Sequence, residues 1–283
     1  TSMEHLLKIA SKIDDIIKFQ AKNRPVILHL IGGEVGYFDL IKIISHIKSE
    51  QLKRVIIATN FSSSKIYWLK LLKYLDSRKI ALKIIASLHL EQCNKKDFAE
   101  KIKLFNHNNI VAIKCVINDN NINEYKNFFK DFENVEIIPT LERKENNINS
   151  NCSEEIIKYI EGLNDKLKKY EKPYYIVTTK NCERKVFYSN VAMINNIEGG
   201  GFNPEGFSCT AGLDGIRIDI DGSLRRAGCQ WCGKQENWLG NLITGEYELP
   251  TEPIICHTTI QHKFLGERHK FCTAFGNTSM ERI

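Results

Sequence analysis

The sequence predicts an α/β protein, in which a body of alternating strands and helices is followed by a cysteine-rich tail. Over residues 1–172, short continuously apolar runs alternate with longer runs of helical periodicity, a pattern typical of a parallel sheet covered by helices. Of the nine cysteines, five crowd into residues 209–272 and the other four are spread singly. We therefore expect two domains, residues 1–172 and 173–283, that meet at Lys172-Pro173.

The body opens on a helical pattern and continues with five strand–helix units. The apolar runs predict strands at residues 25–30, 54–60, 80–88, 109–117 and 135–141. The periodic runs predict helices at residues 3–20, 37–48, 62–75, 95–106, 121–132 and 153–170. A complete eight-fold barrel needs about 250 residues, so a partial barrel or an open doubly wound sheet fits this length better. Because such repeats normally open on a strand, we expect a first strand and its loop upstream.

The tail has a different sequence pattern from the body. Short strands are predicted at residues 174–177 and 185–188, before a glycine-rich break at residues 199–201. Residues 215–222 alternate apolar and polar side chains and end in Asp-Gly, the signature of a β-hairpin. We expect a small domain built around this hairpin.

Composition excludes several classes of protein. The 283 residues are 42% hydrophobic and 26% charged, and the net charge of +6 is mild, with no basic stripe that would indicate nucleic-acid binding. No run of eighteen apolar residues is present, which argues against a membrane span, and the N-terminus lacks a signal-peptide pattern. We therefore expect a cytoplasmic protein whose cysteines are reduced thiols.

The tail cysteines predict a metal site. Cys229 and Cys232 form a C-x₂-C knuckle, and the predicted hairpin would bring Cys209 back beside it, while Cys256 and Cys272 can complete a set of four. Four thiolates suit a [4Fe–4S] cluster or tetrahedral zinc equally well by ligand count. Free structural thiols and a redox dithiol are the metal-free alternatives, and spacing does not decide which four of the five ligate. Nearby histidines could substitute for a cysteine: His257, His262 and His269.

Polar and glycine residues follow several predicted strands. Gly32-Gly33-Glu34 follows the first strand, Asn60 the second, and Ser87 lies at the end of the third. In parallel α/β folds, ligands bind at the carboxyl ends of the strands. Two glycines let the backbone approach a ligand closely, and a carboxylate there can pair with an ammonium group. Taken singly, each residue also suits an ordinary turn or helix cap, as do His89 and Asn118.

These motifs resemble those of the radical S-adenosylmethionine enzymes. The segment LHLIGGE at residues 28–34 resembles the family's GGE motif, Thr59-Asn60 its TN, and Ser87-Leu88-His89 its SLH. The tail resembles the SPASM/twitch auxiliary-cluster domains of the same superfamily through five segments: Cys209–Gly212, Ile218–Gly222, Cys229, Leu239–Leu242 and Pro253–Cys256.

The resemblance implies a fold and a mechanism. A partial (βα)₆ TIM-like barrel would hold S-adenosylmethionine at its mouth, with the Gly32–Glu34 edge on the methionine amino group and Asn60 and Ser87 near other polar parts of the ligand. An electron from a [4Fe–4S] cluster would cleave the sulfonium, and the 5′-deoxyadenosyl radical would abstract a substrate hydrogen. An auxiliary [4Fe–4S] cluster in the tail would transfer electrons. The implied partners are a peptide or protein substrate and an electron donor such as flavodoxin or ferredoxin.

The sequence departs from the family at three places. No CxxxCxxC occurs in residues 1–283, Val35 replaces the proline of the usual GGEP, and the spacing from Gly222 to Cys229 is two residues longer than usual. A second, catalytic cluster is therefore expected only if a CxxxCxxC lies upstream. The alternatives are a degenerate relative that binds a ligand or partner without radical catalysis, or a protein with a structural zinc site in its tail.

Overall fold

The computed structural model divides the chain into two compact units, Ser2–Asn164 and Asp165–Ile283. The residues that it describes are 2–21, 24–105, 110–132, 135–141, 143–144, 147–148, 153–162, 175–178, 184–187, 208–209, 212–213, 215–226, 237–252, 254–255 and 279–282.

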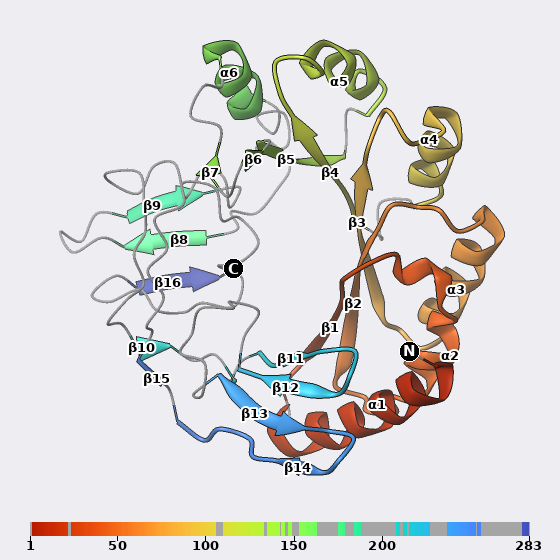
Figure 1. Ribbon diagram of the computed structural model, residues 1–283, viewed down its shortest axis with the longest axis vertical. Helices are drawn as coiled ribbons and strands as arrows, with labels where there is room; N and C mark the ends of the chain where they lie inside the picture. The colour runs from red at the N-terminus through yellow and green to blue at the C-terminus, as the bar shows by residue number, and fades with distance from the viewer. Residues whose placement is uncertain are drawn as a thin grey trace. The chain divides into compact units, whose positions relative to one another are not determined.

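The first unit is built on a five-stranded sheet in which the strands follow one another in sequence order. Every neighbouring pair is parallel, so the carboxyl ends of all five strands lie at one edge (Figure 1). The prediction of an α/β fold with a parallel sheet is confirmed. The strands are β1 (Val26–Leu30), β2 (Leu52–Thr59), β3 (Ala81–Leu88), β4 (Ile110–Ile117) and β5 (Glu136–Leu141).

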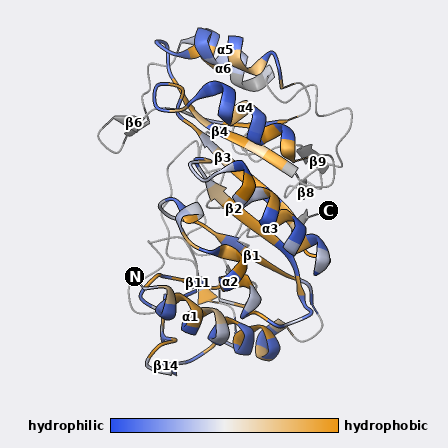
Figure 2. Cartoon of the chain, turned by 90° about the vertical axis from the view of Figure 1, so that its right-hand side faces the viewer, coloured by the Kyte–Doolittle hydropathy of each residue, from blue (hydrophilic) through white to orange (hydrophobic). Residues whose placement is uncertain are grey.

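Helices connect these strands and cover one face of the sheet (Figure 1). In Figure 2 the strands are mostly hydrophobic in colour, whereas α4 and α5 carry long hydrophilic stretches. Side-chain caps begin at least four of the helices; for example, Ser64 accepts from the Tyr67 amide of α3 and Asn94 from the Asp97 amide of α4. The helices are α1 (Met3–Ile16), α2 (Leu40–Ser45), α3 (Lys65–Ser77), α4 (Lys95–Leu104), α5 (Ile122–Phe129) and α6 (Glu154–Gly162).

Three parts of the first unit differ from the predicted elements. The helix predicted at residues 37–48 is shorter because a 3₁₀ turn, η2 (Val35–Tyr37), precedes it and Asp39 then caps α2 through the Lys42 amide. The first helix ends in a π-helical turn, η1 (Ile17–Ala21). Within residues 142–152, predicted as a loop, a two-residue antiparallel pair forms between β6 (Arg143–Lys144) and β7 (Asn147–Ile148).

The described residues of the second unit form three small antiparallel sheets. A hairpin of β11 (Arg217–Ile218) and β12 (Ser223–Arg225) continues into β13 (Trp238–Asn241) and β14 (Glu246–Tyr247), which confirms the predicted hairpin. The short strand β10 (Ser208–Cys209) pairs with β15 (Ile254–Ile255). The predicted strands β8 (Tyr175–Thr178) and β9 (Arg184–Phe187) pair with each other and with β16 (Ser279–Arg282), which was not predicted.

Within the described part of the chain, no helix combines the length and the apolarity that crossing a membrane would require.

The described core of the first unit is mainly apolar, and its sheet also buries one lysine. Leu82 and Ile84 of β3 are buried and share a face with Val55 and Ile57 of β2 by register. Lys83 lies between them in sequence and therefore points to the opposite face. There its ammonium nitrogen lies 2.9 Å from a carboxylate oxygen of Glu136 on β5, with side-chain exposures of 9% and 19%. The pair bridges the intervening strand β4.

We expect Lys83→Met to lower the free energy of unfolding by about 3 kcal/mol, because it leaves a largely buried carboxylate without its ammonium partner. The double variant Lys83→Met/Glu136→Leu should recover most of that loss. Urea denaturation of the full chain would measure both. Lys65→Met, which breaks an exposed pair with Glu100, is the control and should change stability by less than about 1 kcal/mol. A Lys83 variant as stable as this control would contradict the prediction.

Candidate functional site

The residues predicted for a ligand site lie at the carboxyl edge of the parallel sheet. Gly32, Gly33 and Glu34 follow β1, and Asn60 follows β2. Thr59 is in register with Ala86 of β3, so Ser87 lies at the same level as Asn60 along the neighbouring strand. Three successive strand ends therefore carry these residues at one edge.

Glu34 links the turn after β1 to the end of β2. Its Oε1 accepts from the Gly36 amide at 2.8 Å and from the Thr59 hydroxyl at 2.7 Å. Its Oε2 accepts from the Asn60 amide at 2.7 Å. A carboxylate has about four acceptor positions, so one position on Oε2 is left by these three bonds. Glu34 and Asn60 are thus in direct contact, and the remaining acceptor position can take an ammonium group.

Gly32 and Gly33 leave the adjacent backbone open. Their φ angles are +98° and +53°, in the region that favours glycine, and a Cβ added to either would meet no atom within 4 Å. Both residues are exposed. Conformation rather than packing therefore requires glycine here, and the peptide groups of this turn can be approached closely.

The β2–α3 segment holds the turn after β1 at further points. Ser63 donates to the Gly36 carbonyl at 2.6 Å, and the Tyr67 hydroxyl donates to the Phe38 carbonyl at 2.9 Å. Burial raises the pKa of Tyr67 to about 12, so this hydroxyl stays protonated and keeps donating at neutral pH. A Cβ on Gly36 would lie 2.4 Å from the Ser63 oxygen. Sequence reasoning missed these contacts, since only the serine-rich run beside the second strand hints at them.

The substitution of Val35 for the usual proline is compatible with this backbone. Val35 is the first residue of η2 and is buried. The N–H of the first residue of a helical turn has no partner within that turn. Proline and valine therefore both suit the position.

The remaining polar residues at strand ends act in local turns. Asn60 accepts from the Ser62 amide at 2.9 Å, and its side chain remains exposed. Asn118 accepts from the amides of Asn120 and Asn121, both at 3.0 Å, which is the ordinary turn role. Ser87 is half-buried, and His89 is exposed.

Only Cys209 of the five tail cysteines lies within the described residues; Cys229, Cys232, Cys256 and Cys272 lie outside them. Cys209 is paired with Ile254, and Ile255, the residue before Cys256 in the sequence, is paired with Ser208. The β10–β15 ladder therefore runs up to two of the predicted ligands. Among the described residues, no three His, Cys, Asp or Glu side chains gather as they would around a metal ion.

The residues that flank the C-x₂-C knuckle in sequence also make contacts. The Arg226 amide donates to the Asn237 carbonyl at 2.9 Å, which closes the β12–β13 connection that contains Cys229 and Cys232 in sequence. A Cβ on Gly212 would lie 3.0 Å from the Arg226 side chain and 2.7 Å from Pro250. Gly212, three residues after Cys209, thus packs on Arg226, three residues before Cys229.

The two glycine motifs of the tail interlock. The Leu242 amide donates to the Gly222 carbonyl at 2.9 Å, and the Asn241 side chain donates to the Asp221 carbonyl at 3.1 Å. Asp221 accepts from the Ser223 amide at 2.9 Å, and this bond lowers the pKa of Asp221. The motifs Ile218–Gly222 and Leu239–Leu242 thus hold neighbouring turns together.

Two cysteines of the body lie apart from this region of the sequence. Cys115 is buried on β4, and burial raises its pKa far above the ordinary value. Cys93 is half-buried in the turn after β3, and burial raises its pKa too. Raised pKa values keep both as neutral thiols, which is typical of buried, unreactive cysteines.

Comparison with known proteins assigns no family. No protein-family model matches the chain, and no curated protein matches it. Among solved structures, a histidine-tagged protein described as "anSMEcpe with bound AdoMet" aligns with 96% of this chain and 71% of its own, at 17% sequence identity and a TM-score of 0.48. A similarity this low assigns neither a family nor an activity to the chain.

We expect Gly240→Ala to unfold the β11–β14 sheet. The residue has a φ of +110°, and an added Cβ would lie 2.1 Å from the Glu246 carbonyl oxygen, so backbone strain and a collision act together. Gly245→Ala is the matched control, because its φ is +81° but its Cβ would meet nothing within 4 Å; it should cost only about 1–2 kcal/mol. Hydrogen exchange of peptides from residues 215–250 would measure both. Equal protection in the two variants would contradict the prediction.

Proposed function

We propose that this chain is the S-adenosylmethionine-binding body and the cysteine-rich tail of a radical S-adenosylmethionine enzyme that modifies a peptide or protein side chain. The observation that carries the proposal is the set of bonds from Glu34 to Thr59 and Asn60 at the carboxyl edge of the parallel sheet. Two motifs of the family resemblance, found 25 residues apart by sequence alone, are joined there through one carboxylate.

The chemistry of this edge suits the polar end of S-adenosylmethionine. The remaining acceptor position on Glu34 Oε2 would take the methionine ammonium group. The exposed backbone beside Gly32 and Gly33 can accept and donate hydrogen bonds to the same end of the ligand. Ser87, one strand further along the edge, would face another polar part of the molecule. These groups bind and orient the ligand, and the sheet below keeps them in place.

The radical step requires a further group. A [4Fe–4S] cluster would supply the one electron that cleaves the sulfonium of S-adenosylmethionine into methionine and a 5′-deoxyadenosyl radical. The CxxxCxxC that would hold this cluster does not occur in residues 1–283. In this proposal the body of the chain contributes ligand binding and orientation. An electron donor such as flavodoxin or ferredoxin would serve the cluster.

For the tail, we propose an auxiliary [4Fe–4S] cluster held by four of its five cysteines, which are Cys209, Cys229, Cys232, Cys256 and Cys272. Three contacts support this assignment: the β10–β15 ladder, the packing of Gly212 on Arg226, and the bond that closes the knuckle loop. Each lies within a few residues of a predicted ligand. Such a cluster would accept an electron from the substrate or relay electrons.

A second candidate is a ligand-binding protein without radical chemistry. Absence of a CxxxCxxC from the full gene would favour it, and the same edge residues would still bind a ligand with an ammonium group. The two candidates differ in iron content and in the fate of bound S-adenosylmethionine under reduction.

We expect the full chain to bind S-adenosylmethionine saturably and Glu34→Gln to weaken binding by at least about tenfold, because the amide removes the charge that pairs with the ammonium. Isothermal titration calorimetry under anaerobic conditions would measure this. Glu50→Gln, an exposed residue in the turn before β2, should bind like the wild type. Failure of the wild type to bind, or full binding by Glu34→Gln, would overturn the ligand assignment.

We expect about four iron and four sulfide per chain after anaerobic reconstitution, with a broad visible charge-transfer band. Cys229→Ala and Cys232→Ala should each abolish metal retention and reduce solubility, because such a cluster organises its small domain. Cys93→Ser and Cys115→Ala should retain the metal. Stoichiometric zinc without iron would make the tail structural, and full metal content in both knuckle variants would show that the ligand assignment is wrong.

A further inference from the structure

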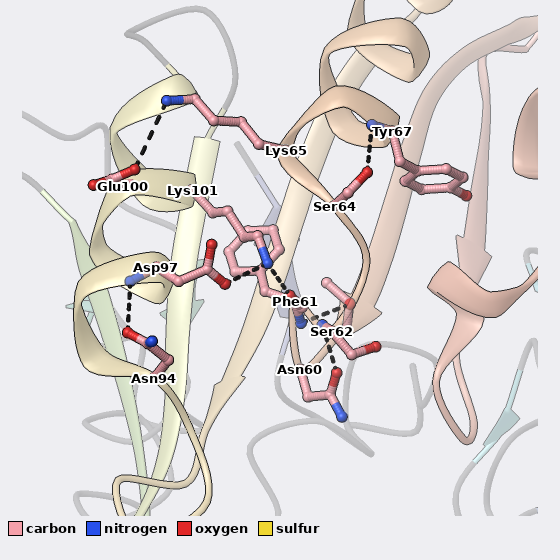
Figure 3. A network of polar contacts seen from close by, with 11 residues as sticks. Asn60, Phe61, Ser62, Ser64, Lys65, Tyr67, Asn94, Asp97, Glu100 and Lys101 are labelled. Carbon is pink, nitrogen blue, oxygen red and sulfur yellow. Dashed lines mark hydrogen bonds and ion pairs between the residues drawn. The ribbon is translucent and has the colours of Figure 1, made fainter.

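One lysine of the first unit is buried on a helix that carries none of the predicted ligand residues. The Lys101 side chain on α4 is 4% exposed, and its ammonium nitrogen lies 2.7 Å from the Phe61 carbonyl oxygen and 2.6 Å from Asp97 Oδ2. Figure 3 shows the side chain reaching from α4 to the turn after β2. A buried ammonium is costly unless acceptors surround it, so these two acceptors account for its position.

The acceptor residue Phe61 has an unusual backbone. Its φ is +61°, in the left-handed region, which is strained for a bulky side chain and persists only where the surroundings hold it. The ring is fixed edge-on to Trp68 and Phe98 and stacked on Phe105, with centroid distances of 5.3, 5.5 and 5.7 Å. The ring therefore fixes one side of the residue, and the bond from Lys101 fixes its carbonyl.

This backbone continues directly into the donors of the ligand edge. The Phe61 amide donates to the Thr59 hydroxyl oxygen at 3.0 Å. That hydroxyl donates to Glu34, and so does the amide of Asn60, the residue between them. The orientation of the two donors thus depends on the conformation of Phe61.

We propose that Lys101 is a positioning residue for the ligand edge. It fixes the left-handed Phe61, so that Thr59 and Asn60 hold Glu34 and the Gly32-Gly33 turn in the binding geometry. The inference rests on the proposed function in that S-adenosylmethionine is taken as the ligand. If Lys101 only stabilised the fold, its loss would not change the hydrogen exchange of the amides at the ligand edge. Nor would it change the S-adenosylmethionine affinity measured well below the unfolding temperature.

The test compares Lys101→Met and Lys101→Arg in the full chain. Methionine keeps most of the apolar stem but cannot donate to Phe61, whereas arginine keeps the charge and the donors. Lys65→Met is the control, because Lys65 of α3 is paired with Glu100 of the same helix α4 but is half-exposed. Hydrogen exchange resolved to single amides and the S-adenosylmethionine affinity are measured at a temperature at which every variant is folded.

We expect Lys101→Met to speed exchange of the Gly36, Asn60 and Phe61 amides by about tenfold and to weaken the affinity by a similar factor. Exchange within β4 should stay unchanged. Arginine should restore most of both, and Lys65→Met should match the wild type. Unchanged exchange and affinity in Lys101→Met would overturn the proposal, even if the variant melts at a lower temperature.

This test can be decided independently of the proposed function. If the wild type binds no S-adenosylmethionine, the ligand assignment fails, while the exchange data still decide the role of Lys101. If Lys101→Met does not fold, Asp97→Asn replaces it, since that change weakens the anchor of the ammonium and leaves the lysine in place. Exchange at Asn60 and Phe61 should then rise by a smaller factor, and an unchanged rate would overturn the proposal.

Discussion

The carboxylate of Glu34 accepts hydrogen bonds from donors that lie beyond the end of the β1–β2 ladder. The backbone ladder between β1 and β2 ends with the pair Leu30 and Ile57. Beyond it β1 passes into a turn, while β2 continues beside β3 to Thr59 before its own turn begins. Buried or half-buried amides need acceptors. One carboxylate offers about four acceptor positions and serves donors from both turns. Beyond the sheet ladder, the Glu34 side chain therefore joins the turn after β1 directly to the end of β2.

This arrangement has a consequence for ligand binding. A ligand that meets a fixed edge does not have to order it, so less binding free energy is lost on association. Ser63 and Tyr67 fix the turn from the α3 side, and Lys101 fixes the turn after β2 from the α4 side. The open stretch is Gly32 and Gly33, which are exposed and have no atom within 4 Å of an added Cβ. Rigid support around a short open stretch of backbone is what a site for a small polar group requires.

The sequence was informative where structure depends on local pattern. The five parallel strands were predicted because strands buried on both faces read as continuous apolar runs. Even Lys83, which interrupts the run of β3, did not obscure it. The hairpin of the tail was predicted from its alternation and the Asp-Gly pair. By contrast, β16 pairs with β8 across about a hundred residues, and a four-residue strand without apolar alternation gives no local signal of such a partner.

The site was only partly predictable for the same reason. Gly32, Gly33, Glu34 and Asn60 stand at strand ends, a position that the repeat pattern reveals. Lys101 does not stand at a strand end. It lies four residues after Asp97 on a helix, a spacing that predicts an exposed i,i+4 ion pair. Its second acceptor, the Phe61 carbonyl, is 40 residues away. Phe61 is held in a left-handed conformation that its sequence does not indicate.

The tail contains parts that depend to different degrees on metal. The β11–β14 sheet is held by backbone ladders, by the interlocked Gly222 and Asn241 turns, and by the salt bridges of Arg217 and Arg225 to Asp219, none of which uses a cysteine. The β10–β15 pair has two residues in each strand, too few to be stable alone. Cys209 lies at the Ile254 end of this pair, whereas Cys256 follows Ile255 in sequence at the other end. On the proposed assignment, ligation of both cysteines would tie the two strands to the same metal. The metal would therefore stabilise this pair most, whereas the hairpin sheet would retain its hydrogen bonds without it.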